Sequence, residues 1–156
     1  NNITRLSALI LFPLFNGMGR VVFGWLSDLF GWKPIMVTSY ALQSAILFAF
    51  PWLMSMRFTA YLTLPLLAMC YGGNFTIFPV ATGQIWGPEH LAANYGIVFL
   101  AFGVGALAGP SLGGIARDAG SINTAFAVAG ALLAAGAIQV AILRHPTRDA
   151  TPAAPE

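Results

Sequence analysis

Five stretches of this sequence are long and apolar enough to cross a lipid bilayer as helices. A transmembrane helix needs about 20 predominantly apolar residues, whereas a membrane β-strand is a run of about 10 residues with alternating polarity. The sequence contains no such alternating runs. We therefore expect an all-α integral membrane protein whose neighbouring helices are antiparallel, because the loops are short. The expected spans are about Leu6–Leu26, Pro34–Leu53, Thr59–Gly83, Asn94–Ala116 and Ile122–Leu143.

The composition identifies lipid as the solvent of these helices. Of 156 residues, 58% are hydrophobic and 8% are charged, and the mean hydropathy is +0.77. Ordinary soluble domains carry about 25% charged residues, so this chain lacks the polar side chains to cover a water-facing surface. Membrane lipid is an expected partner, and nucleic acid is not, because the net charge is only +2 and no basic run is present. Cys70 is the single cysteine and the two histidines lie far apart, so the sequence predicts no disulfide within the chain, no metal site and no cofactor.

We divide the chain into a partial transmembrane bundle, residues 1–144, and a cytoplasmic tail, residues 145–156, whose three prolines and polar composition favour disorder. The chain begins with Asn1, and no signal-peptide charge pattern precedes the first span. We interpret it as the C-terminal part of a longer polypeptide, whose upstream half is then a further partner.

The ends of the spans carry aromatic and basic residues. Aromatic side chains are expected at the membrane interfaces. The candidates are Trp25, Trp32, Trp52, Tyr61 and Trp86. Three basic residues fall on each side of the membrane, so the positive charges leave the orientation open. They are Lys33, Arg144 and Arg148 on one side and Arg5, Arg57 and Arg117 on the other.

The first span carries an arginine, Arg20, where hydrocarbon is expected. Arginine at the centre of a membrane helix costs about 2.5–3.5 kcal/mol on insertion scales, so such residues usually face a water-filled pathway. Arg20 is therefore a candidate ligand residue. The alternative is snorkelling to the interface, because Arg20 lies about six residues, or ~9 Å, before the expected helix end at Leu26.

The sequence after Arg20 predicts a helix break, a turn and a new helix. The break is expected over Gly24–Asp28, the turn at Phe30–Gly31 and the restart at Lys33–Pro34. Asp28 would then end the first helix, where its carboxylate would accept hydrogen bonds from the N-terminus of a neighbouring helix. Lys33 would lie in headgroup water.

The third span is irregular near its middle. Gly72–Gly73 and Pro79 would weaken or kink the helix, and broken backbone at that depth is tolerated only against protein or a water-lined cavity. Tyr71, Asn74 and Phe75 lie at positions i, i+3 and i+4 and share one face, so we expect them at a cavity. The alternative is that Asn74 merely bonds a neighbouring helix.

The fourth span is dense in small residues. Gly105, Gly109 and Gly113 form a small-xxx-small ladder that lets helix backbones approach closely, and packing explains it more simply than a ligand role. Asn94 is the expected N-cap of this helix. The fifth span has no ionisable residue before Arg144 and is expected to be a peripheral packing helix.

Two groups of motifs resemble a known family. Gly24-x-x-x-Asp28-x-x-Gly31-x-Lys33 resembles the loop signature of the major facilitator superfamily, which recurs after the second and eighth of its twelve helices. The chain departs from that signature at Leu29 and Trp32, where basic residues are usual. Three further motifs are similar to the branch of oxalate/formate antiporters and monocarboxylate transporters. They are Asn16-Gly17-x-Gly19-Arg20, Tyr71-Gly72-Gly73-Asn74-Phe75-x-x-Phe78-Pro79 and Asn94-Tyr95-Gly96.

This resemblance implies helices eight to twelve of a secondary active transporter in a bacterial-type inner membrane. The loops after Leu26 and Gly83 would be cytoplasmic. Such a protein would move small organic anions by alternating access between two six-helix halves. Arg20 matches the basic residue that binds the substrate carboxylate. The resemblance gives the pocket Tyr71, Asn74, Phe75 and Phe102, and it makes Gly24, Asp28, Gly31 and Lys33 a gating latch.

The resemblance also bears on the substrate. Dicarboxylate exchangers of this family are expected to carry a second basic residue on helix eleven, and the best alignment puts Phe102 there. No Lys or Arg lies between Asn94 and Arg117. One cation matches one carboxylate, so we expect a monoanion such as formate, lactate or pyruvate.

Two alternatives stay open for the function. One is a member of the same superfamily with a non-anionic substrate, such as a sugar or a drug. The other is a membrane enzyme or assembly subunit. The second is disfavoured, because all 5 acidic residues fall in expected loops or the tail, and no enzyme chemistry is implied.

Overall fold

The computed structural model describes residues 2–53, 55 and 57–143, and every regular element among them is a helix. The 5 long helices are each long and apolar enough to cross a membrane, which confirms the expected all-α, multi-pass membrane fold. The elements are α1 (Asn2–Phe30), α2 (Trp32–Leu53), α3 (Arg57–Trp86), the short 3₁₀ helix η1 (Pro88–His90), α4 (Leu91–Asp118) and α5 (Ile122–Ile142). The predicted disordered tail, residues 145–156, lies outside the described residues.

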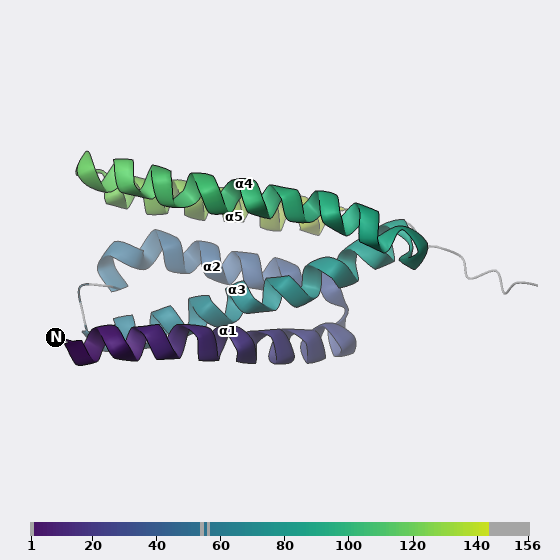
Figure 1. Ribbon diagram of the computed structural model, residues 1–156, viewed down its shortest axis with the longest axis horizontal. Coiled ribbons are helices and arrows are strands. Elements are labelled where there is room, and N and C mark those ends of the chain that lie inside the picture. Colours follow the sequence, from purple (N-terminus) through teal and green to yellow (C-terminus); the bar gives the residue numbers. More distant parts are fainter. Residues whose placement is uncertain (1, 54, 56, 144–156) are drawn as a thin grey trace, which may run out of the picture.

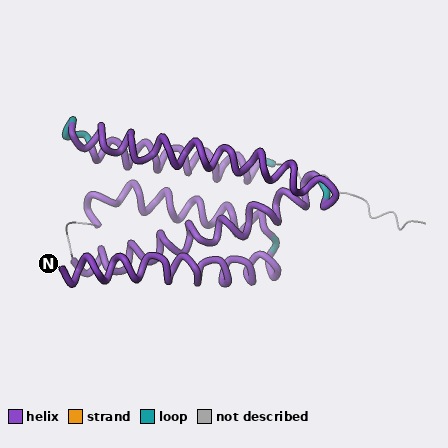
Figure 2. Tube along the Cα trace, viewed as in Figure 1, coloured by secondary structure: helices purple, strands orange, loops and turns teal. Residues whose placement is uncertain are grey.

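The helices form an antiparallel bundle (Figures 1 and 2). In Figure 1, α1 lies along one edge, α4 and α5 lie along the other, and α2 and α3 lie between them. Helix α3 packs against α1, α2 and α4, whereas α1 and α4 do not pack against each other within the described chain. Any site that combines side chains of α1 and α4 from this chain is therefore built across α3.

Helices α1 and α3 cross at glycines, which bring the two backbones into contact. A Cβ added at Gly19 would lie 2.7 Å from the Cα of Met69, and one added at Gly72 would lie 2.9 Å from the Cα of Asn16. Carbon atoms pack at about 3.5–4.0 Å, so no side chain fits at either position. The two family-like motifs that contain these glycines are far apart in the sequence, and they meet at this crossing.

The crossing explains the glycine pair of α3, which the sequence analysis interpreted as a weak point. The helix is continuous through this pair, with Pro65 and Pro79 inside it. Gly72 lies against the backbone of α1, and Gly73 lies against the ring of Phe23. The missing side chains therefore serve close helix contact and do not interrupt the helix.

Helix α1 continues further than the sequence predicted. It runs through Gly24–Asp28 to Phe30, so the break predicted there is wrong. No proline interrupts this stretch, and the left-handed conformation that ends the helix falls on Gly31, with φ +83°. The predicted turn at this glycine is confirmed.

Trp32, which was expected at the interface, is instead 2% exposed and belongs to the apolar core between α2 and α3.

Helix α4 begins earlier than predicted. Gly87 adopts φ +91°, and Pro88 starts η1, which leads directly into α4 at Leu91. Proline fixes a helix-compatible φ, so it favours the start of a helix at this point. The N-cap predicted at Asn94 is therefore wrong, and Asn94 lies in the first turn of α4.

The glycine ladder of α4 faces open space within the described chain. A Cβ added at Gly105, Gly109 or Gly113 would meet no atom within 4 Å. The helix also contains no buried residue. The close approach predicted for this ladder is therefore not made by any helix that the structure describes.

Helix α5 packs along α2. The hydroxyl of Ser44 donates a hydrogen bond of 2.8 Å to the carbonyl oxygen of Gly130. At the end of α5, the Nζ of Lys33 donates to the carbonyl oxygen of Leu143 at 2.6 Å. A cation at a helix C-terminus is stabilised by the helix dipole. Lys33, which was expected in headgroup water, therefore joins the first turn of α2 to the end of α5.

We predict that Gly19→Ala lowers the stability of the full-length protein by about 1–3 kcal/mol, because its methyl group is forced into the backbone of α3. Gly17 is a matched control on the same helix, since a Cβ there meets no atom within 4 Å. Gly17→Ala should leave stability unchanged or raise it through helix propensity. Thermal unfolding of both purified variants in detergent measures the difference. Equal losses of melting temperature would contradict the close crossing.

Candidate functional site

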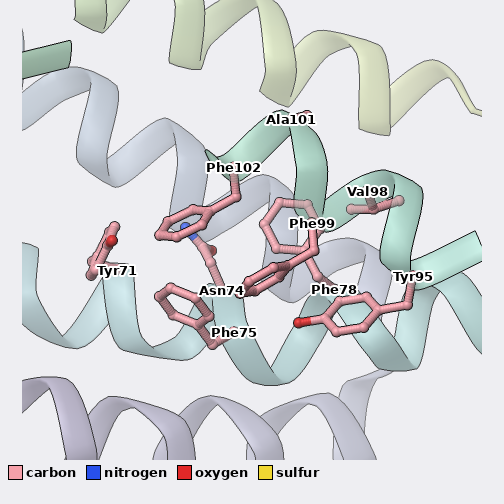
Figure 3. Close-up of a pocket in the computed structure, with 9 residues that line it drawn as sticks. All are labelled: Tyr71, Asn74, Phe75, Phe78, Tyr95, Val98, Phe99, Ala101 and Phe102. Carbon is pink, nitrogen blue, oxygen red and sulfur yellow. The ribbon is translucent and has the colours of Figure 1, made fainter. Parts of the chain in front are cut away.

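A cavity of about 240 Å³ lies between α3 and α4, beside the glycine crossing. Its wall is mostly aromatic, and Asn74 is the only amide among the residues that line it. Figure 3 shows these side chains gathered between the two helices. The lining residues are Tyr71, Asn74, Phe75 and Phe78 from α3, and Tyr95, Val98, Phe99, Ala101 and Phe102 from α4.

Four of the predicted substrate-binding residues line this one cavity: Tyr71, Asn74, Phe75 and Phe102. The Phe75 ring lies at the centre of their contacts. Its centroid is 5.3 Å from that of Tyr71 and 5.0 Å from that of Phe102, and both pairs meet edge to face. Pairs in this geometry contribute about 0.5–1.5 kcal/mol each beyond burial. Ring contacts therefore hold α3 and α4 together at the cavity.

The fifth predicted residue, Arg20, is not among the residues that line the cavity, but it lies against Phe75, which is one of them. Its Cζ is 5.1 Å from the centroid of Phe75, which is cation–π distance. The hydroxyl of Thr76 donates to the backbone oxygen of Arg20 at 3.2 Å and links the two helices at the same level. Within the described residues, no carboxylate pairs with the guanidinium. The side chain is exposed, so its N–H donors are accessible.

The longer α1 weakens the snorkelling interpretation of Arg20. The helix ends at Phe30 and not at Leu26. Arg20 therefore lies ten residues, or about 15 Å, before the helix end, because each residue adds about 1.5 Å. This is four residues further from the helix end than the sequence predicted.

Asn74 combines the two roles that the sequence analysis treated as alternatives. It lines the cavity, and its Oδ1 also accepts a hydrogen bond of 3.2 Å from the hydroxyl of Ser39 on α2. Ser39 in turn contacts Gln43, one helical turn further along α2. Ser39 and Gln43 were not predicted as site residues, because a serine and a glutamine in an apolar helix match no motif. Their spacing of i and i+4 was the available signal.

The four residues of the predicted gating motif lie at the α1–α2 end of the bundle, outside the cavity lining. Gly24 lets α1 approach α3, since an added Cβ would lie 3.1 Å from the Cγ2 of Thr76. Asp28 is exposed and makes no ion pair with the described residues, so the predicted contact with a neighbouring helix N-terminus is not seen among them. Gly31 makes the turn, and Lys33 contacts the end of α5.

Apart from Phe102, the aromatic face of α4 was also missed from the sequence. Tyr95, Val98, Phe99 and Phe102 lie at i, i+3, i+4 and i+7, which is the pattern of one helix face. The rings follow one another along it, with centroids 5.7 Å apart for Tyr95 and Phe99 and 5.3 Å apart for Phe99 and Phe102. In the sequence, the glycines of this span favoured a helix-packing role over a ligand role. Phe78 follows Asn74 by one turn and completes the α3 side.

Comparison with known proteins finds transporters among the relatives of this chain. The oxalate:formate antiporter of Oxalobacter formigenes is 28% identical over 116 residues, which are 74% of this chain and 28% of the relative. The apicoplast pyruvate carrier 1 of Toxoplasma gondii is 33% identical over 85 residues, 54% of this chain and 16% of the relative. Monocarboxylate transporter 14 of Mus musculus is 32% identical over 102 residues, 62% and 19% of the two chains. No solved structure matches the chain.

The sequence matches a family over residues 5–156, almost its whole length. The chain spans between 16% and 28% of the length of the relatives above, which fits part of a larger helical fold. The described bundle of 5 apolar helices has the architecture that such a part requires. This chain therefore belongs to the Major Facilitator Superfamily.

Proposed function

We propose that the full-length protein is a secondary active transporter of small organic anions in a bacterial-type inner membrane. It works by alternating access, with the substrate bound near mid-membrane between two helical halves. The observation that carries this proposal is the position of Arg20. Its guanidinium lies against a ring of the cavity wall and has no carboxylate partner among the described residues. A cation in a poorly solvated membrane site is stabilised by binding an anion.

The side chains around Arg20 suit a carboxylate with a small apolar body. The planar guanidinium donates two parallel hydrogen bonds to one carboxylate, which a lysine does not reproduce. Tyr71 and Asn74 supply neutral polar groups, and Phe75 and Phe102 enclose the apolar part of the substrate. No covalent step is needed for this task.

We further propose that the substrate is a monoanion, such as formate, lactate or pyruvate. The cavity lining contains no basic residue. By the family resemblance, Phe102 would stand where a dicarboxylate exchanger carries a second cation. Relatives of this chain are named for oxalate and formate, for pyruvate and for monocarboxylates. A single arginine favours the monocarboxylates of that set.

The α1–α2 loop serves as a gating latch in this proposal. Asp28 lies in the last turn of α1, where a negative charge opposes the helix dipole and reduces local stability. Its exposed carboxylate is free to dock on the other half of the transporter. Lys33, in the first turn of α2 directly after this loop, contacts the end of α5, so docking at Asp28 would be transmitted to the C-terminal helix.

The anchor role of Arg20 predicts a specific transport phenotype. Counterflow in proteoliposomes that hold the full-length protein should show accelerated uptake with formate, lactate or pyruvate and none with a sugar. Arg20→Lys keeps the charge but loses the bidentate geometry, so uptake should fall at least about tenfold, equivalent to about 1.4 kcal/mol. Arg117→Lys, at an arginine exposed at the end of α4, is the matched control. Near-normal transport in Arg20→Lys, or a response to sugar alone, would overturn the anion assignment.

The role of Phe102 predicts a gain of function. Phe102→Lys adds a second cation to the cavity wall, so oxalate exchange should rise relative to formate exchange in the same vesicles. Phe102→Leu changes the shape without adding charge and should leave the ratio of the two substrates unchanged. The ratio of initial counterflow rates measures the effect. Strong oxalate exchange by the unmodified protein would mean that a second cation comes from an upstream helix.

The latch role of Asp28 predicts a separation of binding from turnover. Asp28→Asn should leave the substrate Kd unchanged and slow the exchange rate, because the side chain lies outside the cavity. Asp118→Asn, at an exposed acid beside Arg117, serves as the control. Binding is measured by titration of the purified protein, and exchange is measured in vesicles. A loss of affinity equal to the loss of rate would argue against a latch.

A further inference from the structure

A chain of polar side chains crosses from α2 to the cavity through the interior of the bundle. Gln43 and Ser39 are 7% and 1% exposed, so both are withdrawn from lipid and from water. The thiol of Cys70, also buried, lies against the same Ser39 hydroxyl. Burying a polar group costs free energy unless the group is hydrogen-bonded, so the geometry of these polar side chains is strongly constrained.

The hydrogen bonds of this polar network run from Gln43 through Ser39 to Asn74. The Nε2 of Gln43 donates to the backbone oxygen and to the hydroxyl of Ser39, both at 3.1 Å. These two bonds use both amide hydrogens of Gln43. The Ser39 hydroxyl accepts one of them and directs its own hydrogen to the Oδ1 of Asn74, at 3.2 Å. In this arrangement the Asn74 amide turns its oxygen towards Ser39.

We propose that Ser39 and Gln43 are positioning residues that fix the Asn74 amide so that its NH₂ group donates to the transported anion. This inference rests on the proposed function. The oxygen of Asn74 is held by Ser39 of α2, and Asn74 also lines the cavity, where Figure 3 shows it among the aromatic side chains. Its nitrogen is then the amide group left to face the cavity. Asn74 directly precedes Phe75, whose ring carries the guanidinium of Arg20. The substrate carboxylate would then accept hydrogen bonds from the Arg20 guanidinium and from the Asn74 amide.

The neutral donor accounts for selectivity as well as affinity. A carboxylate has two oxygens, and each accepts more than one hydrogen bond. Asn74 satisfies part of that demand without a second positive charge, which suits a monoanion. If the amide were free to rotate, its oxygen would face the anion part of the time and repel it. Ser39 and Gln43 prevent that rotation.

The test compares two buried serines of the same helix. Ser39→Ala removes the bond to Asn74 and should raise the Kd for formate about tenfold in the full-length protein, as expected for a mispositioned donor to a charged group. Ser44→Ala removes an equally buried bond, from Ser44 to the carbonyl oxygen of Gly130, which lies away from the cavity. It should leave the Kd unchanged. Gln43→Met should raise the Kd by less than Ser39→Ala, because the Ser39 hydroxyl remains.

A double variant separates positioning from general destabilisation. If Ser39 acts through Asn74, adding Ser39→Ala to Asn74→Ala should raise the Kd no further. The inference is overturned if the two effects multiply, or if Ser39→Ala and Ser44→Ala change the Kd equally. If the unmodified protein transports no anion in counterflow, the proposed function itself fails. If it transports formate and Ser39→Ala binds formate normally, only the positioning role fails.

Discussion

The arrangement of this bundle depends on one steric constraint at the crossing of α1 and α3. The backbones of the two helices occupy the space that a side chain at Gly19 or Gly72 would need. That contact sets the level of α1 relative to α3, and it brings Arg20 next to the Phe75 ring. The position of the charged Arg20 side chain therefore depends on a contact between uncharged backbone atoms at the glycine crossing. Removing the glycines would move the arginine even if the arginine itself were unchanged.

Helix α3 connects all parts of the candidate site. Phe75 contacts Arg20 of α1 and Phe102 of α4, and its neighbour Asn74 is bonded to Ser39 of α2. The contacts differ in kind on the two sides. Backbone packing joins α3 to α1, whereas ring contacts join it to α4.

The sequence predicted the helices well and their interruptions poorly. Span length and charge depletion are local properties, so the five spans and the turn at Gly31 were visible from composition and periodicity. Glycine has two uses in membrane helices, close approach and bending, and only the neighbouring helix decides between them. That is why the pair Gly72–Gly73 was misinterpreted. Ser39 and Gln43 escaped notice for a related reason, since their role exists only through Asn74 on another helix.

The central claim is that Arg20 binds the carboxylate of the substrate, and one distance tests it directly. Solid-state NMR of the full-length protein in lipid, with ¹³C-formate and ¹⁵N-labelled arginine, measures the separation of the formate carbon from the guanidinium nitrogens. Charge-assisted N–H···O bonds are about 2.7–2.9 Å long, so the account predicts strong carbon–nitrogen coupling that disappears in Arg20→Lys. Bound formate that shows no coupling to any arginine, or whose coupling survives that substitution, would contradict it.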